Sequence, residues 1–264
     1  MIREENLIGF LFFLTILFQS CTMVKITVSD QRSQSPRHVL LDGDTVVTTW
    51  GAIKVNQSDF FPSSFRIKSN GKVIFIDPVE TNGTDKADYL FLTHAHPDHF
   101  SMKDIRKLTK PETIFICARG PARRLSKYDY HIKQVKPGDK LDLGDGLKCE
   151  AVAAYNTKPV FLWIKAHPKS QQNVGYILTL GNRVRIYHAG DTDYIPEMSN
   201  IRDISLALVP VGGDNLTMNI EDAAKMVNEI GPEVVVPMHY EVKKQEDLMN
   251  FKSLVEKKVK VEIL

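Results

Sequence analysis

The sequence lacks a dominant charge of either sign. Its 264 residues include 34 lysines and arginines against 32 aspartates and glutamates, a formal net charge of +2. A chain balanced in this way has no overall electrostatic attraction for nucleic acid, so we expect no nucleic-acid partner. With 43% hydrophobic residues, the chain can bury the core of one ordinary globular domain.

Cysteine is also scarce. The chain has three cysteines, Cys21, Cys117 and Cys149. Neither Cys117 nor Cys149 has the spacing of a metal site. Cys117 lies in an apolar run over residues 113–118 and is most simply a small buried hydrophobic residue. A disulfide between Cys117 and Cys149 is compatible with the sequence, but nothing in the sequence indicates one.

The apolar run at the N-terminus is too short for a membrane-spanning helix. It covers residues 7–18, about a dozen positions where a span needs roughly 20. This length suits the core of a signal peptide. The run ends in Leu17-Phe18-Gln19-Ser20-Cys21, which resembles a bacterial lipoprotein cleavage box with Cys21 as the lipidated residue. We therefore predict a signal segment over residues 1–21 and a lipid-anchored or periplasmic protein of the bacterial envelope.

Some residues of this segment depart from that pattern. Phe18 and Gln19 stand where leucine and a small residue are usual, and Glu4 and Glu5 leave the first residues without a clear positive charge. An uncleaved anchor, a plain signal peptide, or a true start at Met23 with a cytoplasmic protein therefore stay open.

Residues 22–44 are predicted to be a linker. The stretch 29–38 is polar and has no apolar periodicity, which is typical of a connection between an anchor and a folded domain. We therefore place the folded domain at residues 45–264.

The most informative part of the sequence is the run Thr93-His94-Ala95-His96-Pro97-Asp98-His99. It holds four metal-capable side chains within six residues, directly after the apolar run 89–92. Imidazole and carboxylate suit zinc, manganese or iron. One such histidine alone would more often be an ordinary core or surface residue, but four clustered ligands predict a metal site.

The pattern His-x-His-x-Asp-His resembles the metallo-β-lactamase superfamily of metal-dependent hydrolases. The resemblance implies further ligands downstream, and they occur in the expected order over residues 46–264. They are His167 before the segment 174–178, Asp191 in the turn His188-Ala189-Gly190-Asp191-Thr192, and His239 after Val234-Val235-Val236-Pro237-Met238. His167 precedes a polar loop, where a lone histidine can be simply exposed.

The periodicity alone predicts a mixed α and β protein. Strands are expected at 45–50, 65–68, 73–76, 89–92, 114–117, 174–180, 184–187, 207–211, 234–237 and 259–264. Helices are expected after Ser101, near 121–126, from Ile220 to Ile230 and around 248–255. With the resemblance, this order implies an α+β fold, the four-layer αββα sandwich, with its metal site on loops at one edge.

The resemblance also implies roles for these residues. His94, His96 and His167 would hold one metal ion, Asp98, His99 and His239 would hold another, and Asp191 would bridge the two. We expect two Zn²⁺ ions, with Mn²⁺ or Fe²⁺ as alternatives. A hydroxide between two such ions is ionised near neutral pH and can attack a carbonyl or phosphoryl centre. Asp98 would be the catalytic residue that orients this nucleophile and passes a proton to the leaving group.

Three further residues are candidates for supporting roles. Asp77 ends a predicted strand and could accept the outer N–H of a ligand histidine, or it could be a plain turn aspartate before Pro78. His188 could be near the site or contact substrate, and Tyr240 could donate to an oxyanion. Tyrosine after a strand is, however, more often a packing residue.

The predicted function is metal-dependent hydrolysis of an ester, lactone or phosphodiester. The compact domain, the His-Ala-Gly-Asp-Thr turn and the Pro-Met-His-Tyr ending resemble the branch with the ascorbate-phosphate lactonase and the N-acyl-phosphatidylethanolamine phospholipase. We expect a small-molecule or lipid-like substrate and a membrane contact through the N-terminal anchor, while nothing indicates an oligomeric state. The alternatives are a nuclease of the same superfamily and a metal-binding protein without turnover.

Overall fold

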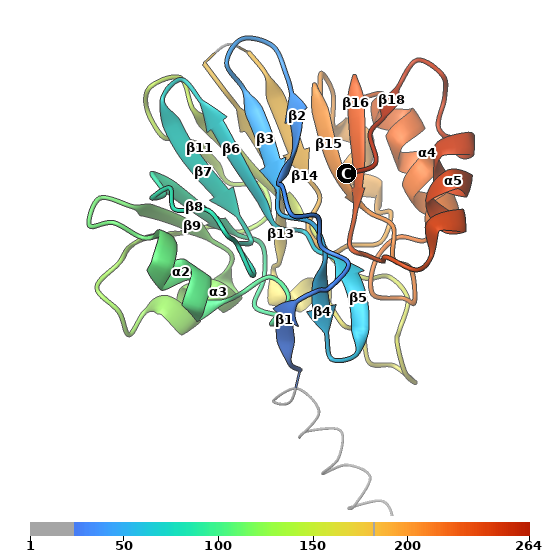
Figure 1. Ribbon diagram of the computed structural model, residues 1–264, viewed down its shortest axis with the longest axis horizontal. Helices are drawn as coiled ribbons and strands as arrows, with labels where there is room; N and C mark the ends of the chain where they lie inside the picture. The colour runs from blue at the N-terminus through green and yellow to red at the C-terminus, as the bar shows by residue number, and fades with distance from the viewer. Residues whose placement is uncertain (1–23, 182) are drawn as a thin grey trace, which may run out of the picture.

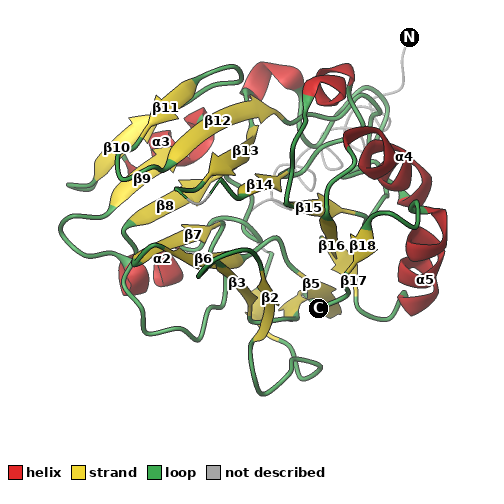
Figure 2. Ribbon diagram, turned by 90° about the horizontal axis from the view of Figure 1, so that it is seen from above, coloured by secondary structure: helices red, strands yellow, loops and turns green. Residues whose placement is uncertain are grey.

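The computed structural model describes residues 24–181 and 183–264, and over these residues it forms a sandwich of two sheets with helices outside each sheet (Figure 1). Seen from above, the order of layers is helix, sheet, sheet, helix (Figure 2). The predicted α+β fold, the four-layer αββα sandwich, is therefore confirmed.

The first seven-stranded sheet carries the N-terminal half of the domain. Its strands in spatial order are β10 (His131–Gln134), β9 (Ile114–Cys117), β8 (Tyr89–Leu92), β7 (Lys72–Ile76), β6 (Phe65–Ser69), β3 (Val46–Thr49) and β2 (Arg37–Leu40). β7, β8, β9 and β10 run parallel. All four side chains of β8 are buried, because this central strand is covered on both faces.

The second seven-stranded sheet carries the C-terminal half. Its strands in spatial order are β11 (Lys140–Asp142), β12 (Lys148–Ala153), β13 (Val174–Thr179), β14 (Arg185–His188), β15 (Leu206–Pro210), β16 (Val234–Met238) and β18 (Lys260–Val261). β14, β15, β16 and β18 run parallel. In each half, several parallel strands therefore end at the same edge, and the loops that follow them lie together there.

The helices cover the outer faces. α2 (Met102–Leu108) and α3 (Arg119–Leu125) pack on the first sheet, while α4 (Ile220–Ile230) and α5 (Gln245–Leu254) lie outside the second (Figure 2). Two 3₁₀ helices, η2 (Lys169–Gln171) and η3 (Pro196–Asn200), lie in loops. The predicted cap at Ser101 is confirmed, because its side chain accepts from the Asp104 N–H. Gly231 ends α4 in the left-handed conformation, as its sequence indicates.

The predicted linker over residues 22–44 is wrong for the part that the structure describes. β1 (Ile26–Val28) joins a small antiparallel sheet with β4 (Ile53–Val55), β5 (Ser58–Phe61) and β17 (Tyr240–Glu241), and β2 lies within the same range. Both β1 and β2 are edge strands, which pair through the backbone on one side only. They therefore need no apolar periodicity, the signal on which the prediction rested.

The predicted signal segment, with the predicted lipidation at Cys21, falls outside the described residues. Among those the structure describes, no helix is long and apolar enough to span a bilayer. Cys117 and Cys149 are both buried and both free, so they do not pair with each other.

The two large sheets are joined by an apolar core and by one buried hydroxyl. The Tyr176 ring on β13 meets Phe91 of β8 edge to face, with ring centroids 5.0 Å apart. Its hydroxyl lies 2.9 Å from the Leu92 carbonyl oxygen and 3.0 Å from that of Ile116, so it donates from one sheet to the other. This contact fixes the end of β8 where the His94–His99 loop begins.

Replacing Tyr176 by phenylalanine should lower the free energy of unfolding by about 1–2 kcal/mol, because buried carbonyl acceptors lose their donor. Tyr187 on β14 offers a matched control, since it is also fully buried but its hydroxyl has no hydrogen-bond partner among the described residues. Tyr187→Phe should therefore be close to neutral. Urea unfolding of both variants measures the difference, and equal losses would show that the inter-sheet hydroxyl contributes nothing.

Candidate metal centre

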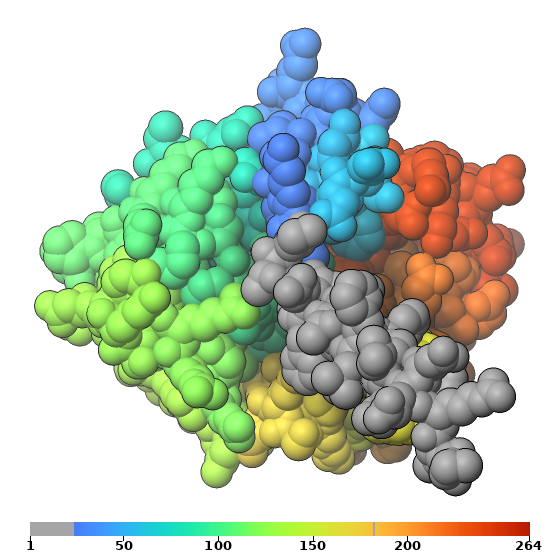
Figure 3. Space-filling view, turned by 90° about the horizontal axis from the view of Figure 1, so that it is seen from below, coloured from blue at the N-terminus to red at the C-terminus, as the bar shows by residue number. Residues whose placement is uncertain are grey.

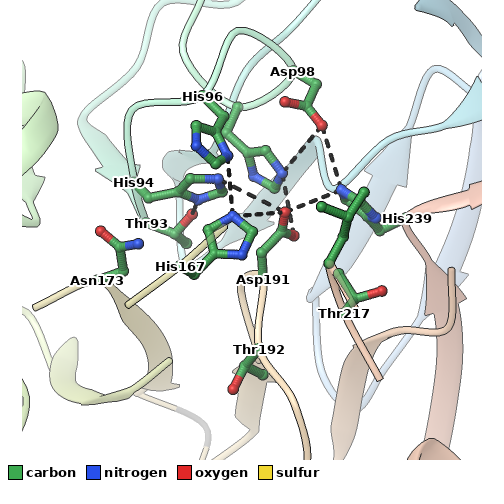
Figure 4. A network of polar contacts seen from close by, with 12 residues as sticks. Thr93, His94, His96, Asp98, His167, Asn173, Asp191, Thr192, Thr217 and His239 are labelled. Atoms are coloured by element: carbon green, nitrogen blue, oxygen red, sulfur yellow. Dashed lines mark hydrogen bonds and ion pairs between the residues drawn. The ribbon is translucent and has the colours of Figure 1, made fainter. Parts of the chain in front are cut away.

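The predicted ligands meet at one edge of the sandwich, where strands from both sheets end (Figure 4). The segment 94–99 follows β8, Asp191 follows β14, and His239 follows β16, while His167 lies in the loop before β13. All seven residues that the sequence singles out as ligands are brought together: His94, His96, Asp98, His99, His167, Asp191 and His239. Residues separated by up to about half of the chain thus share one small volume.

The first group contains His94, His96, His167 and Asp191. One ligand atom from each lies within 4.8 Å of the others. His167 Nε2 is 3.0 Å from His96 Nδ1 and 3.5 Å from Asp191 Oδ2. His94 Nε2 is 3.7 Å from the same carboxylate oxygen. Three imidazoles and a carboxylate therefore point at one centre.

The second group contains Asp98, His99, His239 and again Asp191. His239 Nε2 is 3.0 Å from Asp191 Oδ2 and 3.3 Å from Asp98 Oδ2. His99 Nε2 is 3.3 Å from Asp191 Oδ1 and 3.7 Å from Asp98 Oδ2. The Asp191 carboxylate is shared by the two groups, because it alone belongs to both.

Asp77 orients two of the histidines. Its Oδ2 accepts from His99 Nδ1 at 2.8 Å and from the Thr93 hydroxyl at 2.6 Å, and its Oδ1 accepts from the Thr93 N–H. The Thr93 hydroxyl donates its own proton to Asp77. His94 Nδ1, which lies 3.0 Å from the Thr93 Oγ1 atom, must therefore be the donor in that contact. Both imidazoles therefore engage Nδ1 outside the centre and turn Nε2 inward. This placement fits the accepting role expected for Asp77.

Asn156 orients His167 in the same manner, and the sequence analysis missed it. The Asn156 Oδ1 accepts from the His167 backbone N–H and from His167 Nδ1, at 2.9 and 2.8 Å. Asp193 in turn accepts from the Asn156 side chain at 3.0 Å and from the Thr157 N–H at 2.6 Å. An asparagine eleven residues from its histidine has no spacing signal, so only the structure reveals it.

Two glycines permit the close backbone approaches that place Asp191 and His239. Gly190 has φ +66°, and a Cβ there would lie 2.9 Å from the Val174 carbonyl oxygen. At Gly212 a Cβ would lie 2.3 Å from the His239 carbonyl oxygen. His239 itself has φ +55°, a left-handed conformation that is costly for a histidine. The surrounding packing holds this residue against its local preference.

Burial keeps the three imidazoles of the first group neutral. It lowers the pKa of His94 well below its usual value, lowers that of His96, and lowers that of His167 to about 4. Neutral imidazole is the form that binds a metal ion, so these side chains need not lose a proton first.

In the second group the carboxylates determine the pKa values of the two histidines. Burial opposes the charged form of His99 and His239, but Asp191 and Asp98 raise the pKa of His99 well above normal and that of His239 to about 9. Burial likewise opposes ionisation of the two acids, yet the histidines hold the Asp98 pKa at about 2 and that of Asp191 well below its usual range. The two anionic carboxylates are therefore balanced by the positive charge of His99 and His239.

The residues fit a metal centre by a separate criterion as well. Buried polar atoms normally have hydrogen-bond partners, but His94 Nε2, His99 Nε2 and Asp191 Oδ1 have none among the described residues. All three belong to the two groups described above. Five histidines and two aspartates without cysteine match the donors that zinc, manganese and iron take in open sites.

Of the two roles considered for His188, the structure agrees with a place near the site, and it does not agree with the oxyanion role considered for Tyr240. His188 is fully buried, with Nε2 2.9 Å from the Ser63 carbonyl oxygen and Nδ1 accepting from the Gly190 N–H, so it cannot contact substrate. It supports the turn before Asp191 instead. The Tyr240 ring stacks on Phe61, with centroids 5.1 Å apart, and lines a hollow beside Arg37 and Leu264. It packs there, while the adjacent Phe60 meets the His239 ring edge to face.

Sequence comparison relates this chain to known proteins. The model of the beta-lactamase superfamily domain matches residues 60–239. A UPF0173 protein of Pyrococcus abyssi is 34% identical over 186 residues, 67% of this chain and 79% of its own length. A UPF0173 metal-dependent hydrolase of Staphylococcus saprophyticus is 30% identical over 201 residues, 68% of this chain and 82% of its own.

Solved structures agree. A protein from Parabacteroides distasonis superposes with a TM-score of 0.69 at 30% identity, covering 87% of this chain and 97% of its own. Igni18, a metallo hydrolase from Ignicoccus hospitalis, gives a TM-score of 0.60 at 27% identity over 78% and 92% of the two chains. The matched region spans the strands and loops that bring both histidine groups together, and the chain therefore belongs to the metallo-β-lactamase superfamily as a metal-dependent hydrolase.

Proposed function

We propose that the protein is a binuclear zinc hydrolase. His94, His96 and His167 would hold one ion, Asp98, His99 and His239 would hold the other, and Asp191 would serve both. The observation that carries this proposal is the pair of ligand groups that share the Asp191 carboxylate. A shared carboxylate can give one oxygen to each cation and offset their mutual repulsion. Mn²⁺ and Fe²⁺ suit the same donors.

The metal ions, when bound, would lower the pKa of a water molecule and polarise the oxygen of the scissile bond. The chain's own residues do the rest. Asp77, Thr93 and Asn156 hold the Nδ1 atoms of His99, His94 and His167, so that each of these rings turns Nε2 toward the centre. Because these partners are buried, the rings are held in place before substrate arrives.

Asp98 is the carboxylate that substrate can reach. Its side chain is 21% exposed, whereas that of Asp191 is 2% exposed. Asp98 turns Oδ2 toward His99 and His239, while its side chain stays partly exposed to solvent. In the proposed reaction Asp98 orients the attacking water, takes its proton and delivers it to the leaving oxygen. Substrates that fit this chemistry are esters, lactones and phosphodiesters of small or lipid-like molecules.

Metal content tests the two-group arrangement. Elemental analysis of the saturated protein should find two ions per chain. His96→Ala and His239→Ala should each lose one ion, because each removes a ligand from a single group. Asp191→Ala should lower the metal content more than either histidine variant, since both ligand groups contain Asp191. A wild-type content of one ion at saturation would refute the binuclear proposal.

Asn156→Ala should weaken binding of the first ion about 10–100-fold, because His167 loses the acceptor that fixes its ring. Asn228→Ala is the matched control, since that amide also makes two backbone hydrogen bonds but lies between α4 and the end of α5. Competition with a chelator gives the affinities. Equal affinities for the Asn156→Ala and Asn228→Ala variants would contradict the orienting role.

Asp98→Asn should lower kcat by about 10²–10⁴-fold on whichever substrate is turned over, because the amide cannot take the proton. Chromogenic phosphodiester, lactone, ester and thioester substrates identify the bond. The variant's metal content must be measured in parallel, since Asp98 is also a proposed ligand. A fully loaded wild-type protein without turnover on any of them would favour the alternative of a binding protein.

A further inference from the structure

An unusual run of hydrophobic side chains projects from the loop that precedes His167. Val160, Phe161, Leu162, Trp163 and Ile164 are all exposed, with Trp163 80% and Leu162 63% accessible. Leu216 on the adjoining loop is exposed as well and extends the patch. Soluble proteins rarely present so many neighbouring large apolar groups unless the surface meets a partner.

The projecting loop is an ordered hairpin. The Val160 N–H donates to the Ile164 carbonyl oxygen and the Ile164 N–H donates to that of Phe161, both at 2.8 Å. Its base is held where the Asn156 N–H donates to the His167 carbonyl oxygen at 2.8 Å. Asn215 adds a hydrogen bond to the Pro159 carbonyl oxygen at 3.0 Å. The backbone thus keeps the apolar side chains turned outward.

The composition of the hairpin suits a lipid surface. Tryptophan, phenylalanine and leucine are the residues that interfacial segments bury among lipid headgroups and acyl chains. Lys158 and Lys165 flank the apolar run, and residues 157–168 contain no acidic residue. Two aspartates lie on neighbouring loops or helices, where Asp222 pairs with Lys158 at 3.3 Å and Asp214 pairs with Lys244 at 3.7 Å. Each of these aspartates already faces a lysine.

The position of the hairpin also favours a lipid surface as its partner. Figure 1 draws the yellow loop of this region and β1 at the same lower end of the molecule, and Figure 3 looks onto that end. The described chain starts there at residue 24, and the sequence that precedes it carries the apolar run 7–18. A chain held at a bilayer through that segment would bring this end toward the lipid.

We propose that residues 160–164 insert into the interface of a lipid bilayer and seat the metal centre at the membrane surface. Because His167 follows the hairpin by three residues, the side of the centre formed by the first group would lie next to the lipid. The inference concerns docking, and it holds whichever bond the enzyme cleaves.

The full-length protein carries its own reporter. It has two tryptophans, and Trp50 is buried against Phe75 while Trp163 is exposed at the hairpin. Added vesicles of phosphatidylethanolamine and phosphatidylglycerol should shift the emission to shorter wavelength and reduce quenching by acrylamide. Brominated phospholipids should quench it. In a Trp163→Phe variant the remaining Trp50 signal should not respond.

Matched aspartate substitutions separate the hairpin from the N-terminal segment. Leu162→Asp should weaken insertion by roughly tenfold, so brominated lipids no longer quench Trp163 at the same lipid concentration. Leu40→Asp places the same charge at another exposed leucine, on β2 away from the hairpin, and should behave as wild type. Circular dichroism confirms that both variants fold, and Phe161→Asp replaces Leu162→Asp if that variant does not.

Two results would overturn the proposal. In the first, the chain sediments with vesicles while Trp163 stays open to acrylamide and insensitive to brominated lipid, so that only another segment binds. In the second, Trp163 is already shielded without lipid in a manner that depends on protein concentration. The patch would then be a contact between two copies of this chain.

Discussion

The structure depends on one buried anion, the Asp191 carboxylate. Its side chain is 2% exposed, and such burial is costly unless positive charge lies close by. In the protein alone this charge comes from His99 and His239, whose pKa values the carboxylates raise. Metal cations would supply it in the loaded enzyme. The turn that carries Asp191 is supported by Gly190, where a Cβ would meet Val174, and by the hydrogen bond from the Gly190 N–H to His188.

The sequence reveals the ligands more readily than their supports. His94, His96, Asp98 and His99 are adjacent along the chain, and the buried strand β8 before them has a clear apolar signature. The supporting groups give no such signal, because one hydrogen bond from a distant loop leaves no periodicity. Asn156 is the clearest example, and Tyr240 shows the converse. A polar residue beside a ligand in sequence can face the opposite side of its strand.

The error over residues 22–44 has a related cause. Apolar periodicity reports side-chain burial, but an edge strand is held by backbone hydrogen bonds that any sequence can make. β1 and β2 therefore pair with β4 and β3 although Val39 is their one buried side chain. The exposed hairpin before His167 is the opposite case, because its five hydrophobic residues would suggest a buried strand. Hydrophobicity indicates what a segment contacts, and that partner need not be the rest of the chain.

The base of the hairpin explains how docking and metal binding can lie so close without interfering. Asn156 accepts from both His167 N–H groups through one side-chain oxygen, and its own amide donates to Asp193. Asp193 also accepts from Thr157 at the foot of the hairpin. The orientation of the His167 ring therefore depends on Asn156 and Asp193, and none of residues 160–164 takes part in these hydrogen bonds.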